Sequence, residues 1–424
     1  MQGLHEPRPR LLMLTHRYPA PPNRGDRIRA FHLLAELSEH FDVSLACVSD
    51  REPTAEEIEM LQDRVDRCAV RVIGEPASRL RGLAALATGR PATPACLYRR
   101  DLADRVVGWH RAQPFDAVLT FCSGMIRYAQ AVLWATPASH ARPRHVLDLV
   151  DVDSSKWSAY ARQRRWRWLD PMRWVYAAEA RRLRPVEAGE SVPFDRVTVV
   201  SEREASEYRR HLGANDRLAV VSNGVDLDAY TPRRGPEADA ATPRVVFVGQ
   251  MDYPPNVEAV RWFARHVWPG VRAATPSAVF RIVGRAPVAE VSALTTQPGV
   301  EVTGEVPSVV EELHAATVVV APLRIARGVQ NKVLEAMAAG RPVICSPQAY
   351  EGVGGLRGSE LLVADTPEQW VRDVVALLRD PARRSHVGHA ARSRVEKDRP
   401  WPVALSPMRD LLDPPTLHPL PRVA

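Results

Sequence analysis

Residues 321–345, APLRIARGVQNKVLEAMAAGRPVIC, bring a glycine, an amide, a lysine and a glutamate together around the expected start of a helix. A buried strand leads into a loop that carries Gly328, Asn331 and Lys332, and an apolar helical repeat begins immediately afterwards. Free backbone amides at such a helix start, with the Lys332 ammonium in the first turn, are suited to cradle a diphosphate. Glu335 lies one turn further and could accept hydrogen bonds from ribose hydroxyls. The alternative is a well-capped helix that packs its apolar face on a sheet.

The elements that would position these residues follow one pattern along the chain. Short β-type runs alternate with longer helical stretches, which predicts an α/β fold in which helices cover parallel sheets. In the first half we expect strands at 11–15, 43–48, 69–73, 116–121, 145–150, 196–201 and 218–222, and helices near 26–40, 54–67, 97–112, 125–135 and 153–188. In the second half we expect strands at 244–249, 278–284, 300–303, 317–321, 342–346 and 361–363, and helices near 255–274, 308–315, 329–340, 366–379 and 381–398.

Composition places the domain boundaries. Residues 228–243 are rich in Pro, Gly, Ala and charge without an apolar period, which predicts an interdomain linker. An N-terminal Rossmann-like domain then spans 1–227, and a C-terminal one spans 244–390. Residues 391–424 are expected to form a helix and a Pro-rich tail that could return to the N-terminal domain.

Length and composition exclude several classes of protein. With 424 residues, 45% of them hydrophobic and 25% charged, the chain is expected to form ordinary globular cores. Its apolar runs have the length of strands, far below the roughly 20 residues of a membrane span, and the N-terminus does not read as a signal peptide. Five cysteines without a CxxC pair argue against a disulfide framework or a structural zinc site. We therefore expect a cytoplasmic protein.

The charge balance favours an anionic partner. The 57 basic and 50 acidic residues give a net charge of +7, which suits a nucleotide, a phospholipid or a nucleic acid. The basic residues are spread along the chain and no RNA-binding signature is present, which argues against nucleic acid.

Several motifs resemble a known family. The pattern PLRxxxxGxxxKxxEAMAxGxPVI, with VSNGVD at 221–226 and FVGQMDYPPN at 247–256, resembles the family 4 glycosyltransferases, which have the GT-B fold. RGDRIRAFHLL near the start and DLVDVDSSKW in the middle are similar to bacterial sugar transferases of exopolysaccharide systems. The resemblance implies two Rossmann-like domains facing each other across a cleft. It also implies that the C-terminal domain holds a nucleotide-sugar donor and the N-terminal domain an acceptor.

The resemblance assigns roles to the loop and helix start at 321–345. Lys332 would contact the diphosphate and Glu335 would bind ribose, with Gly328 and Asn331 in the same donor site. Many family members carry a further glutamate eight residues before Glu335, facing the transferred sugar. This chain has Arg327 at that position. Arg327 or Arg324 could instead meet a phosphate or an acidic sugar.

Further donor contacts are expected at the ends of neighbouring strands. Many relatives place an arginine and a lysine after the strand RVVFVG, whereas this chain has no basic residue at 250–253. Arg285 directly follows the next strand and is the best substitute, because ligands of parallel sheets bind at the carboxyl ends of the strands. The alternative is a solvated loop charge. Val306 would line the nucleobase pocket with its backbone groups, unless VTGEV at 302–306 is a plain strand end.

The N-terminal half offers two further candidates. In the loop at 16–31, Gly25 would let backbone amides approach the donor phosphates or sugar, while Asp26 could also cap the following helix. Asp151 follows the strand at 145–150 and would face the cleft, where many relatives carry a histidine or an acid near the acceptor. The alternative for Asp151 is a loop hydrogen bond. Asp153 is the expected N-cap of the next helix. GT-B enzymes rely on dipoles and bases, so neither a metal nor a cofactor is expected.

Residues 156–184 mix four tryptophans with many arginines on a helical period that Pro171 must interrupt. Tryptophan and arginine together suit an anionic lipid surface. The alternative is ordinary packing of Trp157, Trp168 and Trp174 against the N-terminal sheet.

The resemblance implies a glycosyltransferase of the hexosyltransferase type that retains anomeric configuration. It would move a sugar from a nucleotide-sugar to a glycan or polyprenyl-linked acceptor in exopolysaccharide or cell-envelope glycan synthesis, with Lys332, Glu335 and Asp151 as catalytic residues. A cytoplasmic location is expected, with peripheral attachment at the inner face of the cytoplasmic membrane. The alternatives are a GT-B-fold epimerase or hydrolase of nucleotide-sugars and a non-catalytic membrane-associated scaffold.

Overall fold

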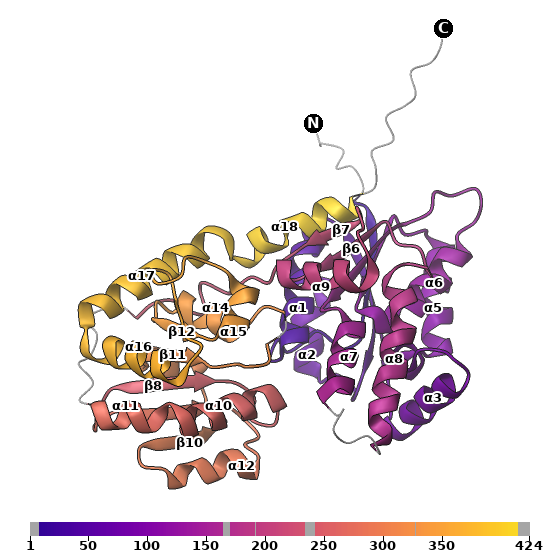
Figure 1. Ribbon diagram of the computed structural model, residues 1–424. Coiled ribbons are helices and arrows are strands. Elements are labelled where there is room, and N and C mark those ends of the chain that lie inside the picture. The colour runs from indigo at the N-terminus through magenta and orange to yellow at the C-terminus, as the bar shows by residue number, and fades with distance from the viewer. Residues whose placement is uncertain (1–7, 164–169, 191, 234–241, 327, 414–424) are drawn as a thin grey trace, which may run out of the picture. The chain divides into compact units, whose positions relative to one another are not determined.

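The computed structural model describes residues 8–163, 170–190, 192–233, 242–326 and 328–413. Its contacts divide the chain into two units. The N-terminal unit comprises Met1–Val200, Glu204–Val221 and Leu405–Ala424, and the C-terminal unit comprises Ser201–Arg203 and Ser222–Ala404. Each unit is built on one parallel sheet with helices against it (Figure 1).

The N-terminal sheet has seven strands in the order β3-β2-β1-β4-β5-β6-β7. They are β1 (Arg10–Thr15), β2 (Asp42–Ser49), β3 (Arg67–Val72), β4 (Ala117–Phe121), β5 (Arg144–Val150), β6 (Arg196–Val199) and β7 (Leu218–Val220). Every neighbouring pair is parallel. Because β1, β4 and β5 are neighbours, the loops after them share one edge of the sheet, the edge at which such sheets bind ligands.

Nine helices and a short 3-10 turn accompany these strands in the described ranges. They are α1 (Gly25–Ser38), α2 (Ala55–Gln62), α3 (Glu75–Ala87), α4 (Ala92–Leu97), α5 (Arg100–Ala112), η1 (Ser123–Met125), α6 (Ile126–Ala135), α7 (Asp153–Gln163), α8 (Pro171–Glu187) and α9 (Glu202–Leu212). The last helix of the described residues, α18 (Trp401–Leu412), ends in this unit.

The C-terminal sheet has six parallel strands in the order β10-β9-β8-β11-β12-β13. They are β8 (Arg244–Val248), β9 (Val279–Val283), β10 (Val300–Gly304), β11 (Val318–Ala321), β12 (Val343–Cys345) and β13 (Leu362–Val363). The helical segments are α10 (Pro254–His266), α11 (Trp268–Ala274), α12 (Ala289–Ser292), η2 (Ala293–Thr296), α13 (Val309–His314), α14 (Asn331–Ala338), α15 (Pro347–Val353), α16 (Pro367–Arg379) and α17 (Pro381–Asp398).

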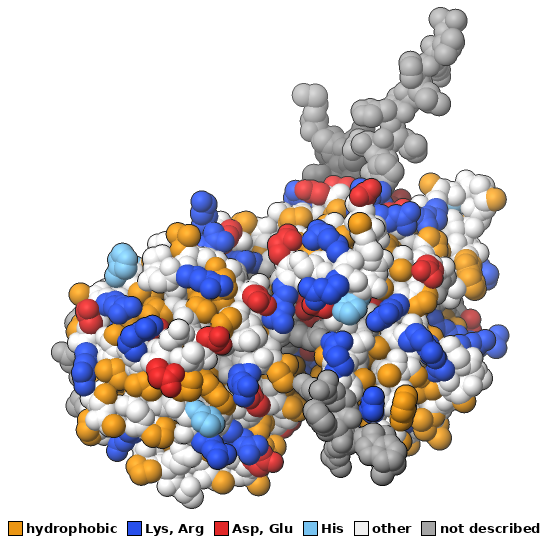
Figure 2. Space-filling model, viewed as in Figure 1, with side chains coloured by type: hydrophobic (Ala, Val, Ile, Leu, Met, Phe, Trp, Pro, Cys, Tyr) orange, Lys and Arg blue, Asp and Glu red, His pale blue; other side chains and the backbone are white. Residues whose placement is uncertain are grey.

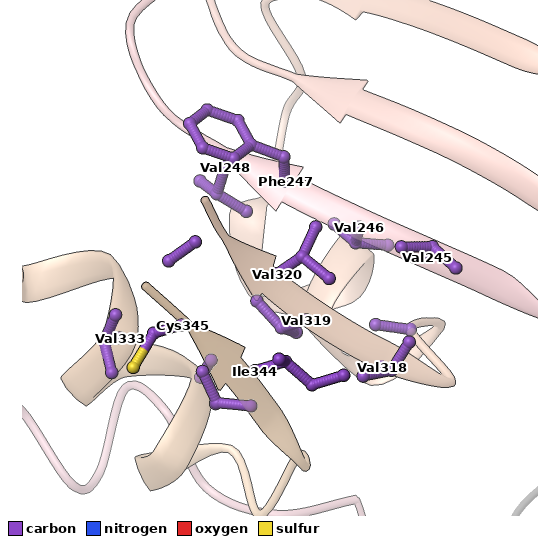
Figure 3. Close-up of a cluster of buried hydrophobic side chains, with 14 of the residues drawn as sticks. Val245, Val246, Phe247, Val248, Val318, Val319, Val320, Val333, Ile344 and Cys345 are labelled. Atoms are coloured by element: carbon purple, nitrogen blue, oxygen red, sulfur yellow. The ribbon is translucent and has the colours of Figure 1, made fainter. Parts of the chain in front are cut away.

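The core of the C-terminal unit lies along its central strands. Figure 3 shows valine, isoleucine and phenylalanine side chains of β8, β11 and β12 packed together, with Val333 of α14 beside them. Such β-branched residues suit strands that are covered on both faces. Helix α14 contacts both β11 and β12, so this packing positions the helix and the loop before it beside these strands.

The predicted α/β class is confirmed, and each predicted strand is present to within two residues. The helices differ in several places. Helices α3, α4, α9, α12 and α15 were not expected, and the segment 255–274 forms two helices, α10 and α11. Helix α3 turns several of its apolar residues outward and contains a glycine, which hides the usual helical period. The segment 153–188 forms two helices, the second beginning at Pro171, a position where proline is favoured.

The tryptophans of 156–184 have different environments. Trp157 packs with Tyr160 and Tyr176 between α7 and α8, with ring centroids 5.9 and 5.2 Å away. Trp174 is 63% exposed, and Trp168 lies outside the described residues. Among the helices of the described ranges, none is at once long and apolar enough to cross a membrane.

Candidate functional site

Glycines lie at the ends of three adjacent strands of the C-terminal sheet: Gly249 follows β8, Gly284 follows β9 and Gly304 ends β10. Gly249 and Gly284 bring the backbone of neighbouring loops into contact. Gly284 follows β9 with φ of +152°, and a Cβ there would lie only 1.7 Å from the carbonyl oxygen of Gly249. The Gly249 amide in turn donates to Val283 at 2.9 Å. The carboxyl edge of β8 and β9 is therefore a close-packed backbone surface that any side chain at these positions would disrupt.

Lys332 of α14 reaches this edge. Its Nζ donates to Oδ1 of Asn256 at 2.6 Å and lies 4.5 Å from the centroid of the Phe247 ring. The side chain of Asn256 is held in place because its amide nitrogen donates to the Gln250 carbonyl at 2.9 Å. A Cβ on Gly249 would lie 2.8 Å from the ammonium. The glycine therefore leaves the space in which the lysine is held.

The pKa values of Lys332 and Glu335 are both shifted toward neutrality. Removal from water lowers the pKa of its ammonium to about 7, although attraction to the Glu335 carboxylate opposes the shift. Burial raises the pKa of Glu335 to about 7, opposed by Lys332 and by a hydrogen bond with the Tyr230 hydroxyl. Both groups change charge near neutral pH, so an anion bound beside Lys332 would favour its protonated form.

Tyr230 and Asn256 are the residues of this site that the sequence did not reveal. Tyr230 lies in the stretch assigned to a linker, and Arg392 of α17 holds its carbonyl at 3.0 Å and that of Ala338 at 2.7 Å. Nothing in the local sequence marks that arrangement. Asn256 could have been noticed, because prolines at the start of α10 place it in a first turn that faces the sheet.

The residues predicted for the donor site around the start of α14 have different environments. Gly328 is buried with φ of 60°, and Gln330 precedes α14 without providing a side-chain cap. Asn331 accepts a hydrogen bond at 3.0 Å from the buried Asn223. Arg324 is exposed and pairs with Glu258 of α10 at 3.3 Å, so it is occupied away from Lys332. Arg327 lies outside the described residues.

Arg285 and Val306 lie at the same strand ends. The Arg285 carbonyl accepts from the Met251 amide at 2.9 Å, which ties the loops after β8 and β9 together. Within the described residues, no hydrogen bond or ion pair engages its partly buried guanidinium. Val306 is partly buried two residues beyond β10 and packs on the C-terminal core. The structure thus brings Arg285 to the backbone edge that also holds the Lys332 ammonium.

In the N-terminal unit, α1 begins at Gly25, which is exposed. A Cβ there would meet no atom within 4 Å, so packing alone does not require a glycine. Asp26 does not cap α1, whose N-cap is Arg24 without a side-chain bond. It pairs instead with His16 at 3.3 Å and Arg17 at 2.8 Å.

His16 is a candidate that sequence reasoning missed. It follows β1, and its imidazole stacks on Phe121 with the ring centroids 5.7 Å apart. Burial opposes its protonation, but interactions with Cys122 and Asp26 outweigh burial and raise the pKa of His16 to about 10. The neighbours that shift this pKa come from other parts of the chain, so only the three-dimensional structure reveals His16 as a candidate.

The acids around β5 have separate roles. Asp148 is fully buried and forms an ion pair with the equally buried Arg29 at 2.9 Å. Val150 has φ of 66°, which is rare for a β-branched residue and often accompanies functional sites. Directly after it, the Asp151 amide donates to Leu149 at 2.8 Å. The chain thus turns sharply at the carboxyl end of β5, where Asp151 was predicted to lie.

Asp153 is the first residue of α7 rather than its N-cap, and its carboxylate accepts from the Ser123 hydroxyl at 2.6 Å. The amide of Ser154 is bound by Glu187, a buried side chain from α8, at 3.0 Å. Burial, then repulsion from Asp153, raises the pKa of Glu187 to about 8. The capping group comes from another helix, which no local sequence pattern shows.

Comparison with solved structures identifies the fold. Sucrose-phosphate synthase from Thermosynechococcus elongatus matches with a TM-score of 0.64 and 16% identity, covering 95% of this chain and 98% of that one. HepE from Anabaena, in complex with UDP, matches with 0.65 and 12%, covering 95% and 99%. WaaG, a glycosyltransferase involved in lipopolysaccharide biosynthesis, matches with 0.62 and 12%, covering 95% and 98%. The chain has the GT-B fold.

A sequence match adds to this likeness. Residues 242–380 match the family described as "Glycosyl transferases group 1". The matched region contains β8 to α16, and with them Asn256, Lys332 and Glu335, but not Tyr230. No curated protein matches the sequence significantly.

Proposed function

We propose that the protein is a glycosyltransferase that uses a nucleotide-sugar donor. The observation that carries the proposal is the Lys332 ammonium, held by Asn256 in the space left by Gly249 at the carboxyl edge of the C-terminal sheet. A cation there, beside the uncapped start of α14, suits a diphosphate. The family match over this region and the UDP bound to HepE support the same reading.

The chemistry is the cleavage of the bond between the anomeric carbon and the nucleoside diphosphate, which leaves with increasing negative charge. Lys332 and the first amides of α14 would stabilise that charge, and Arg285 could add a second cation at the same edge. Glu335 would bind the ribose hydroxyls once Tyr230 has oriented its carboxylate. Gly25 and Asp151 would serve donor and acceptor from the N-terminal unit.

The finer features belong to the same proposal. We expect transfer of a hexose with retention, in which the leaving phosphate itself takes the acceptor proton and no protein base is required. A glycan or polyprenyl-linked acceptor and a role in exopolysaccharide or cell-envelope glycan synthesis follow from the motifs at the start of the chain and in 148–157. The site would then work in the cytoplasm at the inner face of the cytoplasmic membrane.

The test is donor binding followed by transfer. A panel of nucleotide-sugars should include one that raises the melting temperature, because a ligand of the folded state stabilises it. Lys332→Ala should then lower kcat about 100- to 1,000-fold, whereas Lys397→Ala, at an exposed position on α17, should not. Unchanged transfer by Lys332→Ala would refute the assignment. Conversion of the donor in the absence of any acceptor would indicate an epimerase or hydrolase.

A further inference from the structure

Helices α3, α4 and α8 form one connected layer of the N-terminal unit. Helix α3 contacts both α4 and α8. Glu179 of α8 binds the first amides of α4, those of Ala92 and Thr93, at 2.5 and 2.8 Å. These contacts hold α3 beside α8 (Figure 1), so the exposed side chains of the two helices belong to one layer of the N-terminal unit.

Large apolar side chains on this layer are exposed. Leu80 and Leu83 of α3 are 68% and 58% exposed, and Met172 and Trp174 of α8 are 39% and 63% exposed. The inner side of α3 is already packed, since a Cβ on Gly82 would lie 2.6 Å from Sγ of Cys96 in α4. The exposed leucines are therefore an additional apolar face, of a kind that marks interaction sites.

Basic residues outnumber acidic residues on the same layer. Helices α3 and α8 carry six arginines and three acids, Glu75, Glu179 and Glu187, of which Glu179 and Glu187 are buried. Arg79 and Arg181 are exposed, and the Arg173 guanidinium lies 5.2 Å from the centroid of the Trp174 ring. Figure 2 shows hydrophobic and basic side chains intermingled over α3 and α8.

We propose that α3 and the first turns of α8 form a surface that docks on an anionic lipid bilayer. Trp and Leu side chains enter the boundary between headgroups and acyl chains, while arginines meet lipid phosphates. Each basic residue near such a surface contributes attraction that salt weakens. A second copy of the chain fits poorly, because two surfaces that both carry an excess of arginines would repel each other.

This surface is independent of the transfer chemistry, since none of its residues belongs to the sites described above. If the proposed function holds, docking would bring the enzyme to acceptors that are anchored in the membrane. The two inferences fail separately, because vesicle binding needs no sugar donor and donor binding needs no vesicle.

The experiment is sedimentation of the full chain with vesicles of phosphatidylcholine, alone or mixed with phosphatidylglycerol. Binding is expected only to the mixed vesicles, and salt should reduce it. Trp174→Ser and the pair Leu80→Ser with Leu83→Ser should each weaken binding about tenfold. Arg173→Ala should weaken it about fivefold. Trp134→Ser is the matched control, because this tryptophan of α6 is 76% exposed and α6 packs on α5.

If Trp134→Ser and Trp174→Ser lost vesicle binding to the same extent, the assignment of the surface would be overturned. So would failure of the wild type to bind the mixed vesicles, or light scattering that shows a dimer broken by Trp174→Ser. Melting temperatures of all variants should match that of the wild type, since the changed side chains are exposed. If Trp174→Ser lowers the melting temperature, the Leu80 and Leu83 pair and Arg173→Ala decide the result.

Discussion

Asn256 accepts the hydrogen bond of the most important cation in the proposed donor site. A buried ammonium without an acceptor tends to lose its proton, and the oxygen of Asn256 at 2.6 Å is a neutral acceptor that bonds to the charged form. The ring of Phe247 adds a second stabilising contact. The chain has only three lysines, Lys156, Lys332 and Lys397, so the ammonium can be followed individually.

Asn256→Ala should lower the pKa of Lys332 further and weaken binding of the donor nucleotide about ten- to a hundredfold, because a hydrogen bond to a charged group is lost. Asn256→Asp should move the pKa of Lys332 upward, because a carboxylate favours the ammonium, while also competing with the diphosphate. Reductive ¹³C-methylation followed by an NMR pH titration measures the pKa of each lysine, and the exposed Lys397 serves as the reference. An unmoved Lys332 resonance in both variants would show that Asn256 does not control it.

Donor affinity should fall as pH rises through neutrality. The pKa of Lys332 is about 7 in the empty protein, so the ammonium is present below that pH and is lost above it. Above pH 7, binding of a diphosphate must return the proton, and affinity should decline toward about tenfold per pH unit. The diphosphate of a nucleotide-sugar is esterified at both ends and keeps its two negative charges throughout this range.

Calorimetry of nucleotide binding between pH 7 and 8.5, in buffers of different ionisation enthalpy, measures both the affinity and the protons taken up. Glu335→Gln removes the attraction that supports the ammonium, so the decline should begin at lower pH. The Lys332→Met variant should bind the nucleotide weakly, and its affinity should not decline as the pH rises. An affinity that is constant or that rises with pH would contradict the assigned role of Lys332.

At the scale of elements, α15 fixes the loop that precedes α14. Gly352 of α15 lies against the backbone of Gly328, and a Cβ at position 352 would be 2.0 Å from the Gly328 carbonyl oxygen. Ser346 caps α15 and also donates to the Leu323 carbonyl at 2.5 Å. The loop is thereby held at both ends by one short helix, which sets where α14 begins.

Gly352→Ala should force the loop away from α15, cost about 1–3 kcal/mol of unfolding free energy, and weaken nucleotide binding. Gly108→Ala is the matched control, since this glycine of α5 has open space around its missing Cβ. A helical glycine without neighbours should gain about 0.5–1 kcal/mol from alanine. Denaturant unfolding and nucleotide titration of both variants make the comparison. Equal behaviour would mean that the loop tolerates displacement.

Strands and helices could be predicted from the sequence better than side-chain contacts, and the reasons are physical. Strands of a covered parallel sheet are apolar throughout, so runs such as RLLMLT and VVFVG are visible without any partner. Helix α3 was missed because its leucines face outward. The Lys332 contact with Asn256 joins residues 76 positions apart. The Tyr230 bond to Glu335 starts from a stretch that resembles a linker. Such pairings depend on tertiary packing that local patterns do not record.

At the scale of the whole molecule, and apart from the short stretch Ser201–Arg203, the chain passes between its two units near Val221 and again near Ala404. The segments beside these passages are bonded to each other within the C-terminal unit. The Val225 amide donates to the Arg399 carbonyl at 2.7 Å, and a Cβ on Gly224 would lie 2.6 Å from Cα of Trp401. Beyond Ala404, the rest of α18 belongs to the N-terminal unit, where Arg144 donates to the Leu411 carbonyl at 3.1 Å.

The N-terminal unit should therefore depend on α18 for its stability. Leu405, Met408 and Leu412 recur at helical spacing and are fully buried, so Met408→Ala should cost about 2–5 kcal/mol through the cavity it leaves. Val403→Ala, at a 49% exposed position of the same helix, should cost little. Hydrogen exchange resolves where the loss falls. Faster exchange in β1, β4 and β5, with β8 and β11 unchanged, is the expected result. Loss of protection in the C-terminal sheet instead would show that α18 serves the other unit.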